Sequence, residues 1–237
     1  MTKSFVYEGK EYQYELVESR GKRLSATIDE YGRMVVRFPK RVPFSAVNRF
    51  VEEHRKWLVT QYLRAQEQCK AFLHQFTEGE AFYFLGNSYP LKIRRDGAGK
   101  RIRVERLPDC FLIQGTDLTK EMIKKALENW YIHNARIRFE SRCAYYAPLI
   151  GVTYHTIRIK NQKSRWGSCS GKGNLNFNWK LIMAPEEVLD YLVVHELCHL
   201  KYMNHSKEFW SLVESILPNY REQERWIEEN QRRLLIW

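Results

Sequence analysis

Two histidines four positions apart, His195 and His199, constrain the fold of this chain more than any other feature of its sequence. Apolar residues around them follow helical spacing, and Pro185 stands where a helix can open. Each residue turns an α-helix by about 100°, so side chains four apart lie one turn apart on nearly the same face. The sequence therefore predicts a helix from Pro185 to about Asn204 with two imidazoles directed at one point.

Neighbouring residues can complete a metal site on this helix. Zn²⁺ held by three protein ligands keeps one open position and lowers the pKa of a bound water toward about 7. Glu196 stands beside the pair, where its carboxylate can hydrogen-bond such a water. The third ligand must come from beyond these two turns, because three ligands on one straight helix cannot surround a tetrahedral centre. His205 meets this requirement if the chain bends after Asn204.

Other residues compete for parts of this site. Carboxylates of the following helices are alternatives to His205 as the third ligand, namely Glu214, Glu222 and Glu224. We expect the side chain of Cys198 to pack inward rather than to act as a fourth ligand. A peptidase also needs a hydrogen-bond donor for the oxyanion that develops during the reaction. The candidates for that donor are Tyr202, His155 and Arg165.

The amino-terminal half is predicted to mix strands with one long helix. Residues 5–39 fit a small antiparallel sheet, and residues 45–76 have apolar positions three and four apart, as in an amphipathic helix. Residues 80–114 return to strands. They include a basic hairpin between residues 91 and 106 whose predicted turn is Asp-Gly-Ala-Gly.

A second long helix is predicted after this strand region. Thr119 can cap its start, and the pattern runs to about Tyr146 and stops near Pro148. We place the domain boundary just before this helix, which gives an amino-terminal region of residues 1–117 and a second domain of residues 118–237. No internal repeat is visible in the sequence.

Two predicted strands, 153–160 and 175–179, precede the histidine-bearing helix. A strand in this position can form the rim of a cleft to which an extended peptide adds by strand pairing. The loop between the two strands is basic. We therefore expect Lys163 or Arg165 to bind an anionic group of a substrate, and Tyr202 is a further candidate for substrate binding.

Composition narrows the classes of protein that the chain can belong to. The 39 basic and 28 acidic residues give a formal net charge of +11, which would attract polyanions such as nucleic acid or nucleotides. The five cysteines are scattered singly, so neither a disulfide framework nor a thiolate zinc site is indicated. Without a membrane-length apolar run or an apolar signal segment, we expect a cytoplasmic protein with no membrane partner.

Several segments together resemble the YgjP-like metallopeptidase family, which is distantly related to the SprT-type and WLM-type zincin domains. The resemblance is strongest from about residue 154 to 226 and weaker through HRKWL and YFLGNSYPL in the amino-terminal part. The segments that carry it are KSRWGSCS, LNFNWKLIMAP, VLDYLVVHE and HELCHLKYMNHSKEFW.

This resemblance implies an α+β protein in which a zincin-like catalytic region follows the amino-terminal sheet and long helix. It places zinc ligands at His195, His199 and His205 and the catalytic glutamate at Glu196. The spacing of the histidines also matches the metzincins, but Tyr202 stands where those enzymes have a turn glycine. The implied activity is zinc-dependent hydrolysis of a protein or peptide substrate.

Two other functions remain as alternatives. One is a metal-dependent nucleoside-triphosphate pyrophosphohydrolase, although no glycine-rich phosphate loop supports it and Mg²⁺ would favour carboxylates over three imidazoles. The other is a nucleic-acid-associated protease or binding module that uses the basic surface. An intact Glu196 argues against a purely structural metal site, because such a site would not need this carboxylate.

Overall fold

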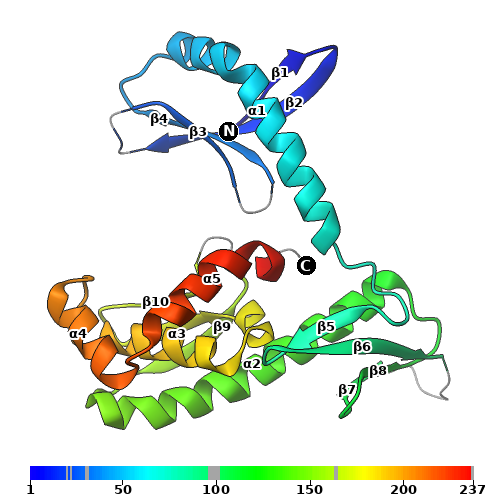
Figure 1. The fold of residues 1–237 in the computed structure, drawn as a ribbon, viewed down its shortest axis with the longest axis vertical. Coiled ribbons are helices and arrows are strands. Elements are labelled where there is room, and N and C mark those ends of the chain that lie inside the picture. Colours follow the sequence, from blue (N-terminus) through cyan, green and yellow to red (C-terminus); the bar gives the residue numbers. More distant parts are fainter. Residues whose placement is uncertain (20, 22, 30–31, 96–101, 163–164, 236–237) are drawn as a thin grey trace. The chain divides into compact units, whose positions relative to one another are not determined.

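The structure is a computed structural model. It describes residues 1–235 apart from 20, 22, 30–31, 96–101 and 163–164, and at residues 68–72 it describes the backbone alone. The described residues form eleven short strands, five α-helices and one 3-10 helix, which confirms a mixed α+β fold. They pack into two compact units (Figure 1). The first comprises Met1–Leu73 and Gln231–Trp237, and the second comprises His74–Asn230.

The first unit holds a four-stranded sheet and one long helix. The strand order is β1-β2-β4-β3, and the elements are β1 (Thr2–Tyr7), β2 (Lys10–Ser19), β3 (Ser25–Ile28), β4 (Met34–Pro39) and α1 (Phe44–Phe72). The expected antiparallel sheet is wrong in one respect, because β2 and β4 pair in parallel. The hairpin of β3 and β4 joins β2 through its second strand, which runs in the same direction as β2.

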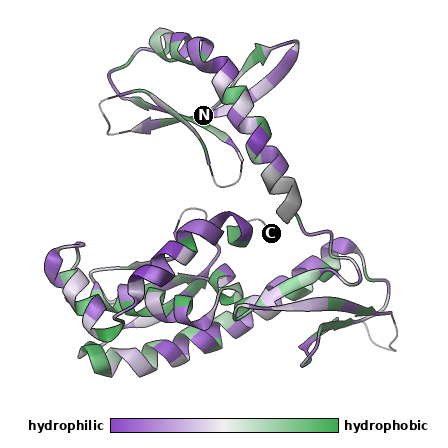
Figure 2. Ribbon diagram, in the orientation of Figure 1, coloured by the Kyte–Doolittle hydropathy of each residue, from purple (hydrophilic) through white to green (hydrophobic). Residues whose placement is uncertain are grey.

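The core of the first unit lies between α1 and this sheet. Val47, Val51 and Leu58 of α1 are almost fully buried, together with Met34 and Val36 of β4. Along α1, hydrophilic and hydrophobic residues alternate in short blocks (Figure 2), as the amphipathic spacing predicted.

The second unit begins with another four-stranded sheet, whose strands are β5 (Ala81–Phe84), β6 (Asn87–Arg94), β7 (Arg103–Arg106) and β8 (Phe111–Gln114). The order is β5-β6-β8-β7, so the predicted hairpin between residues 91 and 106 is wrong. Its first arm pairs in parallel with β8, and its predicted turn lies in residues 96–101, outside the described residues. Phe111 and Ile113 of β8 are fully buried. The apolar strand therefore takes the inner position, and the basic strand β7 stays at the edge.

Helix α2 (Lys120–Ile150) starts as predicted, with Thr119 as its N-cap accepting a hydrogen bond from the backbone of Met122. It continues past Pro148, which lies in the last turn, and ends at Gly151 in the left-handed conformation. A proline so close to the end of a helix removes little intrahelical hydrogen bonding.

The remaining elements surround the histidine-bearing helix. They are β9 (Thr156–Lys160), β10 (Gly167–Cys169), β11 (Asn174–Asn178), the 3-10 helix η1 (Trp179–Met183), α3 (Glu186–Cys198), α4 (Lys207–Ile216) and α5 (Tyr220–Leu235). The three strands form a sheet in the order β10-β11-β9. Helix α3 packs against α2, β10 and η1. Hydrophilic residues dominate α5 (Figure 2).

Helix α3 is shorter than the prediction of a helix to about Asn204. It ends at Cys198, after which the backbone N–H groups bond to carbonyls only three residues back: Leu200 donates to Leu197, and Lys201 donates to Cys198. Ser206 then caps α4 by accepting a hydrogen bond from the backbone of Phe209 at 3.4 Å.

The division between the two units falls after Leu73, earlier than the boundary expected at residue 117. The physical reason is that β5 packs on η1 and β7 packs on α2, so the second sheet groups with the histidine-bearing region. Whether residues 1–117 and 118–237 fold as separate domains stays a prediction. Among the described residues, every helix is too short or too polar to cross a bilayer.

Candidate metal centre

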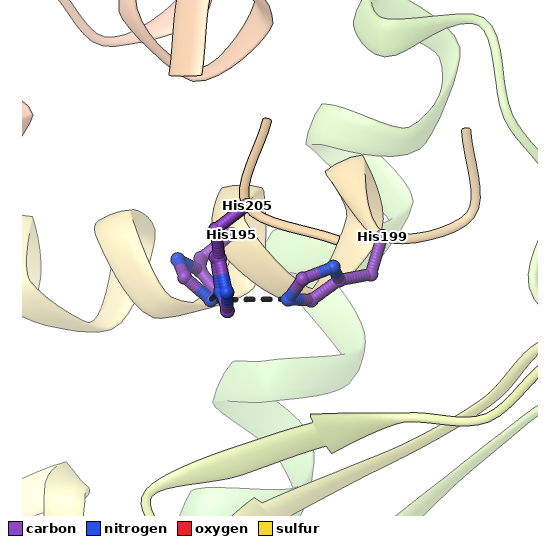
Figure 3. A group of neighbouring side chains, drawn as sticks. All are labelled: His195, His199 and His205. Carbon is purple, nitrogen blue, oxygen red and sulfur yellow. Dashed lines mark hydrogen bonds between the residues drawn. The ribbon is translucent and has the colours of Figure 1, made fainter. Parts of the chain in front are cut away.

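Three imidazoles converge where α3 ends and the following loop returns. The Nε2 atom of His195 lies 3.2 Å from Nε2 of His199 and 3.1 Å from Nε2 of His205. Figure 3 shows the ring of His199 directed toward the other two rings. The ligand atoms of the three residues all lie within 4.8 Å of one another, and no other such group of His, Cys, Asp or Glu occurs in the described parts of the chain.

The local fold explains this convergence. His195 lies in the last turn of α3, and His199 is the residue that caps the end of that helix. The tight turns after Cys198 reverse the chain and bring His205 back against the helix. The backbone carbonyl of Tyr202 lies 3.0 Å from Nδ1 of His199, which orients that ring with Nε2 toward the group.

Aromatic side chains of α4 hold the imidazoles in place. The ring of Phe209 stacks on His199 with centroids 4.5 Å apart. Trp210 stacks on His205 at 5.6 Å and on Tyr220 of α5 at 5.3 Å. A wall of packed rings restricts the rotamers of the histidines, which favours one fixed arrangement of their nitrogen atoms.

Burial keeps the histidines at the centre of the group uncharged. Desolvation lowers the pKa of His195 to about 3, and the neighbouring His199 and His205 contribute to this shift. Desolvation is also the main cause of the lowered pKa of His199. Both rings are therefore neutral near pH 7, the protonation state in which imidazole binds a metal.

Hydrogen bonding within the group cannot satisfy all three nitrogens. A neutral imidazole carries one N–H, yet Nε2 of His195 has two close nitrogen neighbours. One cation between the rings would satisfy all three lone pairs. The two separations are close to the roughly 3.3 Å between neighbouring ligands of tetrahedral zinc, as follows from Zn–N bonds of about 2.0–2.1 Å. The donor set therefore fits a zinc ion.

Glu196 follows His195 on α3, and its buried carboxyl group lies against Gly167 of β10. Its residue is 4% exposed, and atom Oε2 has no hydrogen-bond partner among the described residues. Desolvation raises its pKa to about 8, while the positive charge of Arg165 acts in the opposite direction. The carboxyl group therefore holds its proton more firmly than an exposed glutamate does.

The remaining candidates lie in different places. Arg165 is exposed and close enough to affect Glu196 electrostatically. Tyr202 is 38% exposed, and its backbone rather than its hydroxyl contacts His199. His155 is exposed, and its backbone pairs with Gly173. Lys163 lies outside the described residues.

The competing third ligands lie outside this group. Glu214 and Glu222 do not join the imidazoles, and Glu224 instead accepts a hydrogen bond from the hydroxyl of Tyr191 at 3.5 Å. Cys198 is fully buried and not part of the group either, as expected for a packing residue.

Sequence reasoning missed two kinds of residue at this site. The rings of Phe209 and Trp210 are visible in the sequence as apolar positions of α4, but their stacking on histidines depends on how the loop returns. Gly167 falls in the loop predicted between the strands 153–160 and 175–179, whereas the structure places it in β10, directly against the carboxyl group of Glu196. Only the close approach of that strand to α3 reveals why glycine stands there.

Two solved structures similar to this chain are metallopeptidase zymogens. Abylysin of Pyrococcus abyssi is 28% identical with a TM-score of 0.37, and the match covers 40% of this chain and 96% of that one. Jannalysin of Methanocaldococcus jannaschii is 24% identical with a TM-score of 0.36, and the match covers 39% and 96%. A comparison with curated proteins found no match.

The family description "YgjP-like, metallopeptidase domain" matches residues 22–230, which is most of the chain. This range includes the three converging histidines and Glu196, together with the segments in which the resemblance was noted. The chain therefore belongs to the YgjP-like family of metallopeptidase domains.

Proposed function

We propose that this protein is a zinc-dependent peptidase in which His195, His199 and His205 hold the ion and Glu196 is the catalytic base. The observation that carries the proposal is the convergence of three imidazole nitrogens, one of them on the residue that precedes the buried Glu196. Membership of a metallopeptidase family supports a metal-dependent peptidase. The HExxH pattern on α3 corresponds to the zincin-like arrangement that the resemblance implied.

A zinc ion with three imidazole ligands keeps one position open, at which it acidifies water and polarises a carbonyl group. A residue of the chain itself would transfer the protons. Glu196 would remove a proton from the attacking water and then deliver it to the amine that leaves. Its burial suits this double use, because desolvation raises the pKa of the carboxyl group and makes the carboxylate a stronger base than an exposed one.

Strand β10 is the best candidate for the rim that holds an extended substrate. Of the two strands expected in that position, β11 within 175–179 is paired on both sides, and β9 within 153–160 is an edge strand that packs against α2. Strand β10 is at the edge of the sheet and packs against α3 beside Glu196. A peptide that pairs with β10 would therefore lie next to the catalytic carboxyl group.

Arg165 is the best supported donor for the oxyanion or for an anionic substrate group. Of the three donor candidates, only Arg165 is seen to influence Glu196 electrostatically. It comes two residues before β10, so its exposed side chain can reach a peptide on that strand. The substrate-binding assignments of Lys163 and Tyr202 remain proposals with less support.

The decisive experiment replaces Glu196 with glutamine. We expect cleavage of an unfolded protein substrate, followed by mass spectrometry, to fall by about 10³-fold or more, in line with the loss of a proton-transferring group. Zinc content measured by elemental analysis should stay unchanged. The control is Glu187→Gln, an exposed residue of the same helix. Full turnover by the Glu196 variant would overturn the proposed mechanism.

A nucleotide pyrophosphohydrolase and a nucleic-acid-binding module are the other two candidates. Neither gains a specific observation from the described residues, whose one metal-type cluster consists of histidines alone. The peptidase proposal therefore stands alone here.

A further inference from the structure

The fold contains the same arrangement of four strands and a helix twice, although no repeat was visible in the sequence. The first copy is β1 to β4 with α1, in the order β1-β2-β4-β3. The second is β5 to β8 with α2, in the order β5-β6-β8-β7. In each copy the first two strands are antiparallel, the second and fourth are parallel, and the third and fourth are antiparallel.

The two copies also agree in register. Tyr14 lies opposite Met34 in the first sheet, and Leu91 lies opposite Phe111 in the second, with the same separation along the chain. The turn that joins the first two strands has left-handed conformations at both of its residues in each copy. These residues are Glu8 (φ 48°) and Gly9 (φ 74°) in the first copy, and Leu85 (φ 48°) and Gly86 (φ 79°) in the second.

In the second copy this turn holds another segment of the chain. The backbone N–H of Leu85 donates to the carbonyl of Ile182 at 2.9 Å, and that of Gly86 donates to Met183 at 3.3 Å. A Cβ on Gly86 would lie 3.1 Å from the backbone of Pro185, so the two segments are in close contact. The turn therefore binds η1 and the start of α3 through main-chain groups.

The helix of the second copy completes this binding surface. The ring of Trp179 stacks on Tyr131 of α2 with centroids 5.9 Å apart. Lys180 is close enough to Lys124 and Glu128 of α2 for both to influence its pKa, which burial lowers to about 8. An apolar segment with an aromatic and a basic residue thus fills the space beside α2 and β5.

At the matching turn of the first copy, the described residues place no such segment. No heavy atom of the described chain lies within 4 Å of the position that a Cβ on Gly9 would take, and Val6, next to this turn, is 59% exposed. Between β1 and α1 there is a hollow of about 530 Å³, lined by residues that include Phe5, Asn48 and Glu52. Counted from the starts of the two helices, Asn48 and Glu52 correspond to Lys124 and Glu128.

The charges of the first copy suit the same kind of segment. Lys124, which disfavours a further positive charge in the second copy, corresponds to the neutral Asn48 in the first. Glu128 corresponds to another glutamate, Glu52. Glu52 is half exposed and forms an ion pair of 3.1 Å with Arg55. Lys3 also lines the hollow, so a basic side chain there would meet the carboxylate of Glu52 with a lysine nearby, as Lys180 meets Glu128 near Lys124 in the second copy.

From this correspondence we infer that the first unit is a docking site for an extended apolar peptide segment of another protein, with an aromatic and a basic residue like those of η1. Main-chain carbonyls of the peptide bind the N–H groups of the Glu8–Gly9 turn, as the carbonyls of Ile182 and Met183 bind those of Leu85 and Gly86. Its side chains cover Val6 and enter the hollow beside Glu52. This inference goes beyond the proposed peptidase activity, because it concerns binding alone.

The test measures binding of a fluorescein-labelled peptide, NWKLIMAP, to the full chain by fluorescence anisotropy, with a chelator present to prevent hydrolysis. This sequence is that of residues 178–185. We expect saturable binding that weakens about tenfold in Glu52→Lys, equivalent to the loss of one good contact. A peptide with glutamate in place of its lysine should bind Glu52→Lys better than the wild-type chain. Val6→Ser should weaken binding of the original peptide as well.

Ile137→Ser is the matched control, because Ile137 is an equally exposed apolar residue (54%) of the second unit. It should leave binding unchanged, and circular dichroism should show that all variants are folded. Absence of saturable binding, or binding insensitive to both first-unit substitutions, would overturn the inference. So would a dimer in light scattering that persists with excess peptide, because the surface would then belong to a second copy of the chain.

Discussion

Gly167 of β10 lies so close to Glu196 of α3 that a methyl group on the glycine would be 2.8 Å from Cγ and 2.9 Å from Cδ of the glutamate. Real Cβ atoms do not approach other carbon atoms so closely, so any larger residue must displace the carboxyl group. The absent side chain at position 167 is therefore what leaves room for the carboxyl group of Glu196 against β10.

We predict that Gly167→Ala lowers peptidase activity by about 10²-fold, the effect expected when a catalytic group is misplaced by about 1 Å. Zinc content should remain near that of the wild-type protein, because the histidines are not displaced. Gly171→Ala is the control, since no described heavy atom lies within 4 Å of the new Cβ. Unchanged activity in Gly167→Ala would show that the carboxyl group does not need this position.

Alanine at any one of the three histidines should abolish stoichiometric zinc binding. With two imidazoles left, the affinity for zinc falls because each ligand contributes to closing the tetrahedral site. Elemental analysis after dialysis is the measurement. His54→Ala changes a histidine of α1 in the first unit and should retain the metal. If His205→Ala kept full zinc content, a different residue would have to be the third ligand.

Stability at low pH should depend on Glu80. Burial acts to raise the pKa of this carboxyl group, but hydrogen bonds from the backbone of Thr77, from His74 and from the backbone of Gln75 together outweigh it, so the pKa lies below 4.5. A carboxylate whose pKa is lowered by folding stabilises the folded protein at pH values above the pKa that the same group has in the unfolded chain. This contribution to stability is lost as the pH falls through the pKa of Glu80 in the folded protein.

We therefore expect Glu80→Gln to lower the free energy of unfolding by about 1–3 kcal/mol at pH 7, the cost of leaving buried donors poorly paired. The difference from the wild type should shrink below about pH 4.5, where the wild-type carboxylate also becomes protonated. Denaturant titrations across pH 3–7 would measure it. Glu105→Gln, at an exposed position of β7, should show no such trend.

The ion pair between Arg142 and Asp190 should contribute to the attachment of α3 to α2. Its two hydrogen bonds, Nε to Oδ1 at 2.5 Å and Nη2 to Oδ2 at 2.6 Å, are bidentate, and Tyr146 donates a third at 3.0 Å to Asp190. The side chains of Arg142 and Asp190 are only 22% and 13% exposed. Loss of one partner would leave the other charge poorly solvated.

Asp190→Asn should therefore lower the free energy of unfolding by about 3 kcal/mol, the range for breaking a shielded pair from one side. The control is Glu140→Gln, which breaks a half-exposed pair with Arg136 on the same helix α2. That change should cost only about 0.3–0.5 kcal/mol. Equal effects of the two substitutions in thermal unfolding would contradict the predicted difference.

Features that depend on local sequence were predicted well. The amphipathic spacing of α1, the cap at Thr119 and the cap at Ser206 are encoded by residues within a few positions of one another. The convergence of the imidazoles was also accessible, because His195 and His199 share one helix face and His205 follows the end of that helix within a few residues.

Features that depend on contacts between distant residues were missed. The parallel pairing of β6 with β8 arises because Phe111 and Ile113 bury more apolar surface than the basic strand β7, a comparison that a local turn signal does not include. Strand β10 consists of glycine, serine and cysteine, and it lacks the apolar alternation by which strands are recognised.

The repeat was missed for a similar reason. Tyr14 and Leu91 occupy the same place in the two sheets, as do Met34 and Phe111, but each pair shares only its apolar character. A fold can keep such positions apolar while the identities of the residues diverge completely. The correspondence therefore emerges from strand pairing and not from a comparison of letters.

The Leu85–Gly86 turn of the second copy restricts which substitutions that copy can accept, whereas no described residue imposes such a restriction at the turn of the first copy. Leu85 and Gly86 secure the residues just ahead of the histidine-bearing helix, and Gly86 combines a positive φ with close contact to Pro185. A mutation there would disturb the start of that helix. The Glu8–Gly9 turn supports no helix of this kind among the described residues, so substitutions at that turn would leave the start of the histidine-bearing helix undisturbed.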